Sequence, residues 1–107
     1  MMHRQTVIIG GGPAGLAAAL RLHEKGIEDI LILEREKLLG GILRQCIHDG
    51  FGLTRVGESL SGPEYAQRFI DRVREAGIEC ITDCTVLSVS GEKRVDAVSR
   101  KEGLLQI

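Results

Sequence analysis

Three glycines near the start of the chain, Gly10, Gly12 and Gly15, have the spacing G-x-G-x-x-G. In a loop of this kind the first glycine makes a tight turn, the second lets backbone approach a pyrophosphate, and the third lets a helix pack closely on a strand. The N–H groups at the start of that helix, and its dipole, favour the negative charge of phosphates. The spacing therefore predicts a dinucleotide site. The segments on either side of the glycines determine how specific that prediction is.

The segments around these glycines have the order that such a site requires. A β-branched run predicts a buried strand over residues 6–10, and an alanine-rich stretch predicts a helix over 13–25 with Gly26 just past its end. The apolar run of residues 29–34 predicts a second buried strand. Residues 5–34 therefore predict a β-turn-α-β unit with two parallel strands and a right-handed crossover.

Glu34 ends the second predicted strand, where its carboxylate can accept hydrogen bonds from both hydroxyls of an adenosine ribose. The same charge would repel a ribose 2′-phosphate, so a site for NADP alone is disfavoured. The alternative is a tight turn followed by a solvated glutamate, but strand, glycines, helix, strand and acid all fall in register. No Gly-Lys-Ser or Gly-Lys-Thr follows the glycines, which excludes the phosphate loop of nucleoside triphosphatases.

The composition is that of one ordinary globular domain: 107 residues, 43% apolar and 27% charged. The net charge of −1 gives no reason to expect nucleic acid or a membrane surface as a partner. The first residues contain too short an apolar run for a secretion signal or a membrane span. Cys46, Cys80 and Cys84 are an odd number of cysteines, so we expect reduced thiols in the cytoplasm.

The rest of the chain predicts a loop-rich segment, a helix and then strands. Residues 35–62 carry many glycines, with at most a short helix over 43–48. An amphipathic pattern predicts a helix over 63–76. A parallel strand near 78–82 and a three-stranded antiparallel meander over 85–107 follow.

The stretches VIIGGGPAGLAAALRLHEKGI and ILILERE, followed by the pair Gly40-Gly41, resemble the N-terminal signature of flavoproteins with two dinucleotide-binding domains. These are the glutathione-reductase-like, FAD-dependent pyridine nucleotide-disulfide oxidoreductases. GGILRQCIHDGFGL and SGPEYAQRF are similar to the FAD- and NAD-dependent dehydrogenases associated with anaerobic glycerol-3-phosphate dehydrogenase systems. The resemblance covers the whole chain and implies an α/β fold: a truncated, three-layer, FAD-type Rossmann half-domain with a parallel sheet and an antiparallel β-meander.

The same resemblance implies FAD as cofactor, with NAD(P)H as co-substrate, and suggests a role for each matching residue. Glu34 binds the adenosine ribose, Arg35 flanks the adenine, and Val86 offers the adenine backbone hydrogen bonds. Gly41 and Ile42 lie along the cofactor toward the ribityl chain and the flavin. The pyrophosphate is held by five residues of the first loop and helix: Gly10, Gly12, Pro13, Ala14 and Gly15.

The chain departs from the family pattern at its cysteines. Cys46 is alone in the segment where disulfide reductases carry a redox pair, so a reductase of that type is not expected. Cys46 and His48 could lie near the flavin ring, although a buried thiol and a loop histidine are the simpler interpretation. Cys80 and Cys84 have no further ligands nearby, so we predict no metal site. We assign no catalytic acid, base or nucleophile.

Family members are several hundred residues long, so residues 1–107 are expected to be the N-terminal part of an FAD/NAD(P)-binding domain. The predicted function is the FAD-binding portion of an oxidoreductase that passes electrons between NAD(P)H, or a small organic substrate, and flavin. The alternatives are an NAD-binding Rossmann module of another dehydrogenase, against which Gly40-Gly41 and the meander argue, and a fragment that binds no cofactor tightly. By itself the chain is expected to be inactive, and to associate with itself or with the remainder of its parent enzyme.

Overall fold

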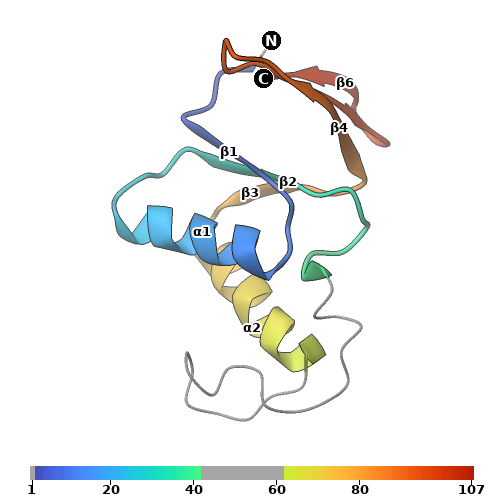
Figure 1. Cartoon of the computed structure of the whole chain (residues 1–107). Coiled ribbons are helices and arrows are strands. Elements are labelled where there is room, and N and C mark those ends of the chain that lie inside the picture. The colour runs from blue at the N-terminus through green and yellow to red at the C-terminus, as the bar shows by residue number, and fades with distance from the viewer. Residues whose placement is uncertain (1, 42–61) are drawn as a thin grey trace.

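The computed structural model describes residues 2–41 and 62–107, which form three layers (Figure 1). Two helices make one outer layer, a parallel sheet makes the middle layer, and an antiparallel sheet makes the other outer layer. One apolar core lies between the helices and the parallel sheet, and a second lies between the two sheets. The predicted α/β, three-layer arrangement is therefore confirmed.

The middle sheet consists of three parallel strands in the order β1-β2-β3. They are β1 (Thr6–Ile9), β2 (Ile30–Leu33) and β3 (Glu79–Ile81). Every residue of β2 is buried, because one face of the strand packs in the first core and the other face packs in the second. Its sequence, ILIL, is therefore apolar throughout and does not alternate with polar residues. All three strands occur where the apolar runs predict them, each one or two residues shorter.

Helices α1 (Pro13–Glu24) and α2 (Gly62–Glu75) cover one face of this sheet. Each ends one residue before the predicted end, within the usual uncertainty of a helix boundary. Their apolar faces, together with Ile30 and Ile32 of β2, form the first core: Leu16, Ala19, Ala66, Phe69, Ile70 and Val73. The short helix predicted over 43–48 lies outside the described residues. Neither described helix has the length and apolar character that a membrane span requires.

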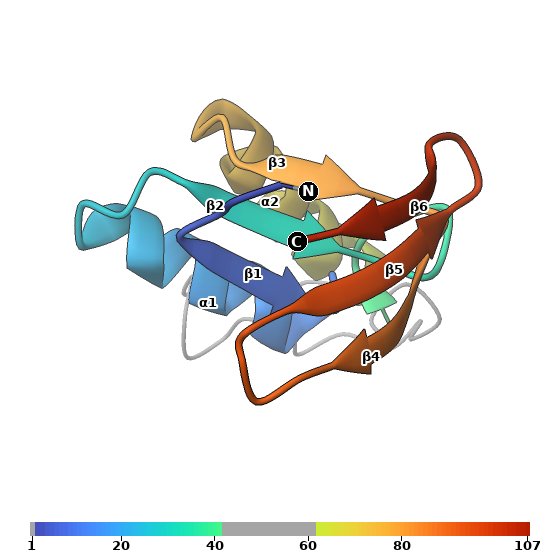
Figure 2. The ribbon, with the colours of Figure 1, turned by 90° about the horizontal axis from the view of Figure 1, so that it is seen from above.

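The antiparallel sheet is the predicted meander, in the order β4-β5-β6. Its strands are β4 (Cys84–Val89), β5 (Val95–Ser99) and β6 (Gly103–Gln106). Cys84, Val95 and Ala97 point inward and pack against Leu31 and Leu33 of β2. Figure 2 shows this sheet lying across the parallel sheet, on the side away from the helices, with both chain ends beside it.

Arg4 links the beginnings of all three parallel strands. Its Nε lies 2.5 Å from Oδ1 of Asp29, just before β2, and its Nη1 lies 2.5 Å from Oε2 of Glu79, at the start of β3. The other oxygen of Asp29 accepts a hydrogen bond from the Gln5 N–H at 2.9 Å. These contacts hold the amino-terminal ends of the three parallel strands together.

Candidate nucleotide site

The candidate site lies at the carboxyl ends of β1 and β2, where ligands bind in open α/β sheets. A hollow of about 310 Å³ opens there. One side is formed by residues that end or follow these strands: Ile9, Gly10, Leu33, Glu34 and Arg35. The other side is the start of the meander: Cys84, Thr85 and Val86. The hollow therefore lies between the two sheets and next to the start of α1.

The glycine-rich turn has the geometry that its sequence predicts. Gly10 has φ +109°, a conformation that favours glycine, and its N–H donates to the Leu33 carbonyl at 2.8 Å. A Cβ on Gly15 would lie 2.0 Å from the Gly10 carbonyl oxygen, so α1 can approach the turn only without that side chain. Among the described residues beyond its chain neighbours, a Cβ on Gly12 would meet only the Gly41 Cα, at 3.8 Å, so the described part of the chain leaves space beside this part of the loop.

The start of α1 presents backbone donors beside this open space. Gly12 is the N-cap and Pro13 occupies the first turn, where its missing N–H removes no helical hydrogen bond. Within the described part of the chain, no side chain caps this helix and no acidic residue lies in its first turn. The first N–H groups of a helix lack partners inside it, so this end suits an anion.

Glu34 is buried, with 7% of its surface exposed, and both of its oxygens are engaged. Oε1 accepts a hydrogen bond from the Gly11 N–H and Oε2 accepts one from the Glu36 N–H, each at 2.7 Å. The alternative of a solvated glutamate is therefore wrong. Each carboxylate oxygen can accept more than one hydrogen bond, so both retain capacity for hydroxyl donors.

Gly11 joins the first glycine segment to the second. Besides its bond to Glu34, its carbonyl accepts a hydrogen bond from the Gly40 N–H at 2.7 Å. Gly41 has φ +56°, and a Cβ on it would lie 2.9 Å from the Gly12 Cα. The G-x-G-x-x-G pattern gives Gly11 no role, because residue 11 is one of its variable positions. In the sequence, Gly11 is notable only as the middle of three consecutive glycines.

The other predicted site residues that the structure describes lie around the hollow or at the start of α1. Arg35 is at the rim of the hollow, largely exposed, with Nε 3.7 Å from Oε1 of Glu36. Val86 lines the opposite wall. Pro13 and Ala14 begin α1. Three residues of interest fall outside the described residues: Ile42, Cys46 and His48.

Cys80 and Cys84 are free thiols in separate cores. Cys80 packs against the core on the helical side of the sheet, whereas Cys84 belongs to the core between the sheets. Burial raises the pKa of both thiols, which lowers their reactivity at neutral pH. Within 2–41 and 62–107, no three His, Cys, Asp or Glu side chains gather as metal ligands would.

The family model described as pyridine nucleotide-disulphide oxidoreductase matches residues 7–51, from β1 past Gly40-Gly41. Residues 7–51 of the chain belong to this family. The hydrogen cyanide synthase subunit HcnB of Pseudomonas protegens is 45% identical over 113 residues, covering 97% of this chain and 24% of that protein. The dihydrolipoyl dehydrogenase of Buchnera aphidicola is 34% identical over 104 residues, covering 84% of this chain and 21% of that protein.

Solved structures support the fold of this oxidoreductase family for the described residues. The bacillithiol disulfide reductase Bdr from Bacillus cereus matches with a TM-score of 0.77 at 22% identity, covering 96% of this chain and 36% of that structure. The chain spans less than a quarter of the length of these two curated relatives. The association with glycerol-3-phosphate dehydrogenase systems is not tested by these matches and stays a prediction.

Proposed function

We propose that this chain holds the adenosine and pyrophosphate half of FAD within a larger enzyme that moves electrons between NAD(P)H, or a small organic substrate, and flavin. Residues 1–107 would be the N-terminal part of the FAD/NAD(P)-binding domain of that enzyme. The observation that carries the proposal is the buried carboxylate of Glu34, held by the Gly11 and Glu36 N–H groups at the mouth of the hollow. A carboxylate oriented in this way suits the two hydroxyls of a ribose.

The pyrophosphate would lie across the glycine-rich turn and the start of α1. The residues proposed to hold it are those of the motif: Gly10, Gly12, Pro13, Ala14 and Gly15. The open space beside Gly12 and the uncapped helix start support this placement, because phosphate oxygens can accept hydrogen bonds from the free N–H groups. Gly41 and Ile42 would follow the cofactor toward the ribityl chain and the flavin.

The adenosine would occupy the hollow between the two sheets. Glu34 would accept the ribose hydroxyls, Arg35 would flank the adenine at the rim, and the backbone of Val86 would contact the adenine edge from β4. The negative charge of Glu34 would repel a 2′-phosphate, so the site favours FAD or NAD over NADP.

The flavin, when bound, supplies the redox chemistry, and the protein supplies position and electrostatics. The described residues of the site bind and orient; none of them is assigned as an acid, base or nucleophile. The Cys80 and Cys84 thiols, one partly buried and one buried, have raised pKa values and are unsuited to disulfide exchange. We also propose a cytoplasmic location, where such thiols stay reduced, and association with the rest of the parent enzyme or with a second copy.

The first test is cofactor identity in the full-length protein. The released cofactor is identified by its visible absorbance, and the apoprotein is then titrated with FAD and, separately, with NAD while thermal unfolding is followed. A ligand at 100 times its Kd stabilises a folded protein by about 2.7 kcal/mol. FAD is expected to give this stabilisation together with bound yellow flavin. Stabilisation by NAD alone would favour the NAD module, and no response to either would favour a fragment without tight cofactor binding.

The second test concerns the redox partner. The FAD-loaded protein is mixed anaerobically with NADH or NADPH, and the visible absorbance of the flavin is recorded. Loss of that absorbance shows electron transfer from the nicotinamide to the flavin. Full retention of it with both nucleotides would leave a small organic substrate as the electron donor.

A further inference from the structure

Asp83 connects the parallel sheet to the meander, between the end of β3 and the start of β4. Its φ is +50°. Asp83 and Lys93, with φ +64°, are the non-glycine residues with positive φ in the described part of the chain. L-residues adopt this left-handed conformation rarely, and Asp and Asn adopt it more easily than most.

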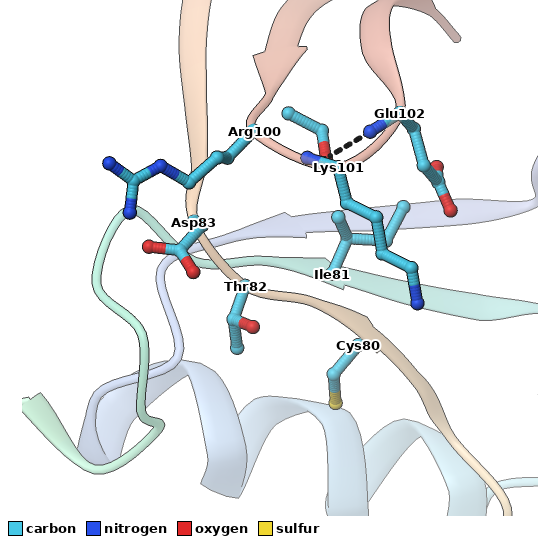
Figure 3. Close-up of a pocket in the computed structure, with 8 residues that line it drawn as sticks. Cys80, Ile81, Thr82, Asp83, Arg100, Lys101 and Glu102 are labelled. Carbon is cyan, nitrogen blue, oxygen red and sulfur yellow. Dashed lines mark hydrogen bonds between the residues drawn. The ribbon is translucent and has the colours of Figure 1, made fainter.

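The left-handed turn directs successive backbone groups toward the segment that holds Glu34. The Asp83 N–H donates to the Glu36 carbonyl and the Cys84 N–H donates to the Glu34 carbonyl, each at 2.9 Å. The Asp83 carbonyl accepts from the Arg100 N–H at 3.0 Å, which joins the same turn to the end of the β5–β6 hairpin. Figure 3 shows Asp83 below Arg100, where the chain leaves Ile81 and Thr82.

Glu34 is consequently held by its backbone as well as by its side chain. Its N–H donates to the Ile81 carbonyl at 2.9 Å, on the β3 side of the turn, and its carbonyl accepts from Cys84 on the β4 side. Cys84 is also fixed by burial, with 1% of its surface exposed. The first residues of β4 therefore start from a defined point beside Glu34, and residues 84–86 line the nucleotide hollow together with Glu34.

We propose that Asp83 is a positioning residue for the nucleotide site: its left-handed backbone places residues 84–86 so that they close the adenosine hollow over Glu34. The inference rests on the proposed function, because closing this hollow matters only if the adenosine of FAD occupies it. The role belongs to the backbone conformation. Residues that adopt a positive φ readily, glycine and asparagine, should therefore preserve it.

The surroundings of Asp83 allow the backbone effect to be tested without a steric one. The side chain borders a second hollow, of about 330 Å³, formed by residues 80–83 and 99–102 (Figure 3). A valine is close to aspartate in size, so Asp83→Val introduces little crowding but strongly disfavours a positive φ. Lys93→Val is the matched control, because it imposes the same conflict in the β4–β5 turn, at the far end of β4 from the hollow.

The experiment measures FAD binding by the full-length protein through quenching of flavin fluorescence, alongside the free energy of unfolding in urea. We expect Asp83→Gly and Asp83→Asn to bind FAD like the wild type, within about twofold, and Asp83→Val to bind about tenfold more weakly. Lys93→Val should lose stability similarly and keep the wild-type Kd for FAD. If Asp83→Val does not fold, Asp83→Ala replaces it, since alanine conflicts less with a positive φ.

The outcomes separate this inference from the proposed function. A wild-type protein that does not bind FAD overturns the proposed function, and the positioning role with it. A wild-type protein that binds FAD, with Asp83→Val (or Asp83→Ala) binding equally well, overturns the positioning role alone. An equal loss of affinity in Lys93→Val also overturns it, because the loss would then follow general destabilisation. Weaker binding confined to the Asp83 variants, and restored by glycine, supports it.

Discussion

The Gly11 N–H donates a hydrogen bond of 2.7 Å to Oε1 of Glu34 across 23 positions of the chain. This contact joins the glycine-rich turn after β1 to the acid after β2. Because the Glu36 N–H holds the other oxygen, the carboxylate has a fixed orientation in the protein by itself. A ligand that binds it need not first order the side chain, and such preorganisation increases affinity.

Glu34→Gln should destabilise the protein as well as weaken FAD binding. One carboxylate oxygen becomes an NH₂ group, which cannot accept a hydrogen bond. The N–H of Gly11 or of Glu36 would then face this NH₂ group and would lose its acceptor. We expect a loss of about 1–3 kcal/mol in the free energy of unfolding, measured in urea. The control is Glu36→Gln, whose side chain is 68% exposed and which should change stability by less than about 0.5 kcal/mol. Equal stability of the two variants would contradict the role of the Glu34 contacts.

Gly15→Ala should disrupt the contact of α1 with the turn. The added Cβ would lie 2.0 Å from the Gly10 carbonyl oxygen, which is backbone and cannot turn aside. We expect a loss of about 3 kcal/mol or more, at the upper end of overpacking penalties, in urea unfolding. The control is Gly91→Ala, since within the described part of the chain no atom beyond the neighbouring residues lies within 4 Å of a Cβ there. A Gly15→Ala protein as stable as Gly91→Ala would show that α1 does not pack as described.

Gly11→Ala should be milder, and its effect should depend on Leu39. The added Cβ would lie 2.5 Å from Cδ2 of Leu39, the flexible end of a side chain, and 3.3 Å from Oε1 of Glu34. We expect a loss of about 1–2 kcal/mol for Gly11→Ala. In the double variant with Leu39→Ala, the combined loss should be smaller than the sum of the single losses by at least about 0.5 kcal/mol. Additive losses in this double-mutant cycle would count against the contact.

Acid should weaken the amino-terminal edge of the parallel sheet. The hydrogen bond from Arg4, and then that from the Gln5 N–H, hold the pKa of Asp29 below its usual value. A carboxyl group whose pKa is lower in the folded than in the unfolded protein stabilises the fold. This stabilisation is fully present above the unfolded-state pKa and is lost as the pH falls through the folded-state pKa, here below about pH 4. Unfolding in urea at a series of pH values should therefore show a smaller acid loss for Asp29→Asn than for the wild type. Identical pH dependence would rule out this contribution.

Local patterns predicted most of the fold because each depends on residues near one another in the chain. The apolar run of β2, the alanine-rich α1 and the turns of the meander all belong to this class. The burial of Glu34 could not be predicted in this way, since it depends on Gly11, on Glu36 and on a wall that begins at Cys84. The left-handed turn at Asp83 was equally hidden, because nothing in TDC distinguishes it from an ordinary link between strands.

The most direct test of the central claim is a crystal structure of the full-length protein with FAD bound. We predict a ribose hydroxyl of the FAD adenosine within about 3 Å of a Glu34 carboxylate oxygen, the pyrophosphate at the start of α1, and the adenine against residues 84–86. FAD bound elsewhere in the protein, or bound with its adenosine away from Glu34 and β4, would contradict the account.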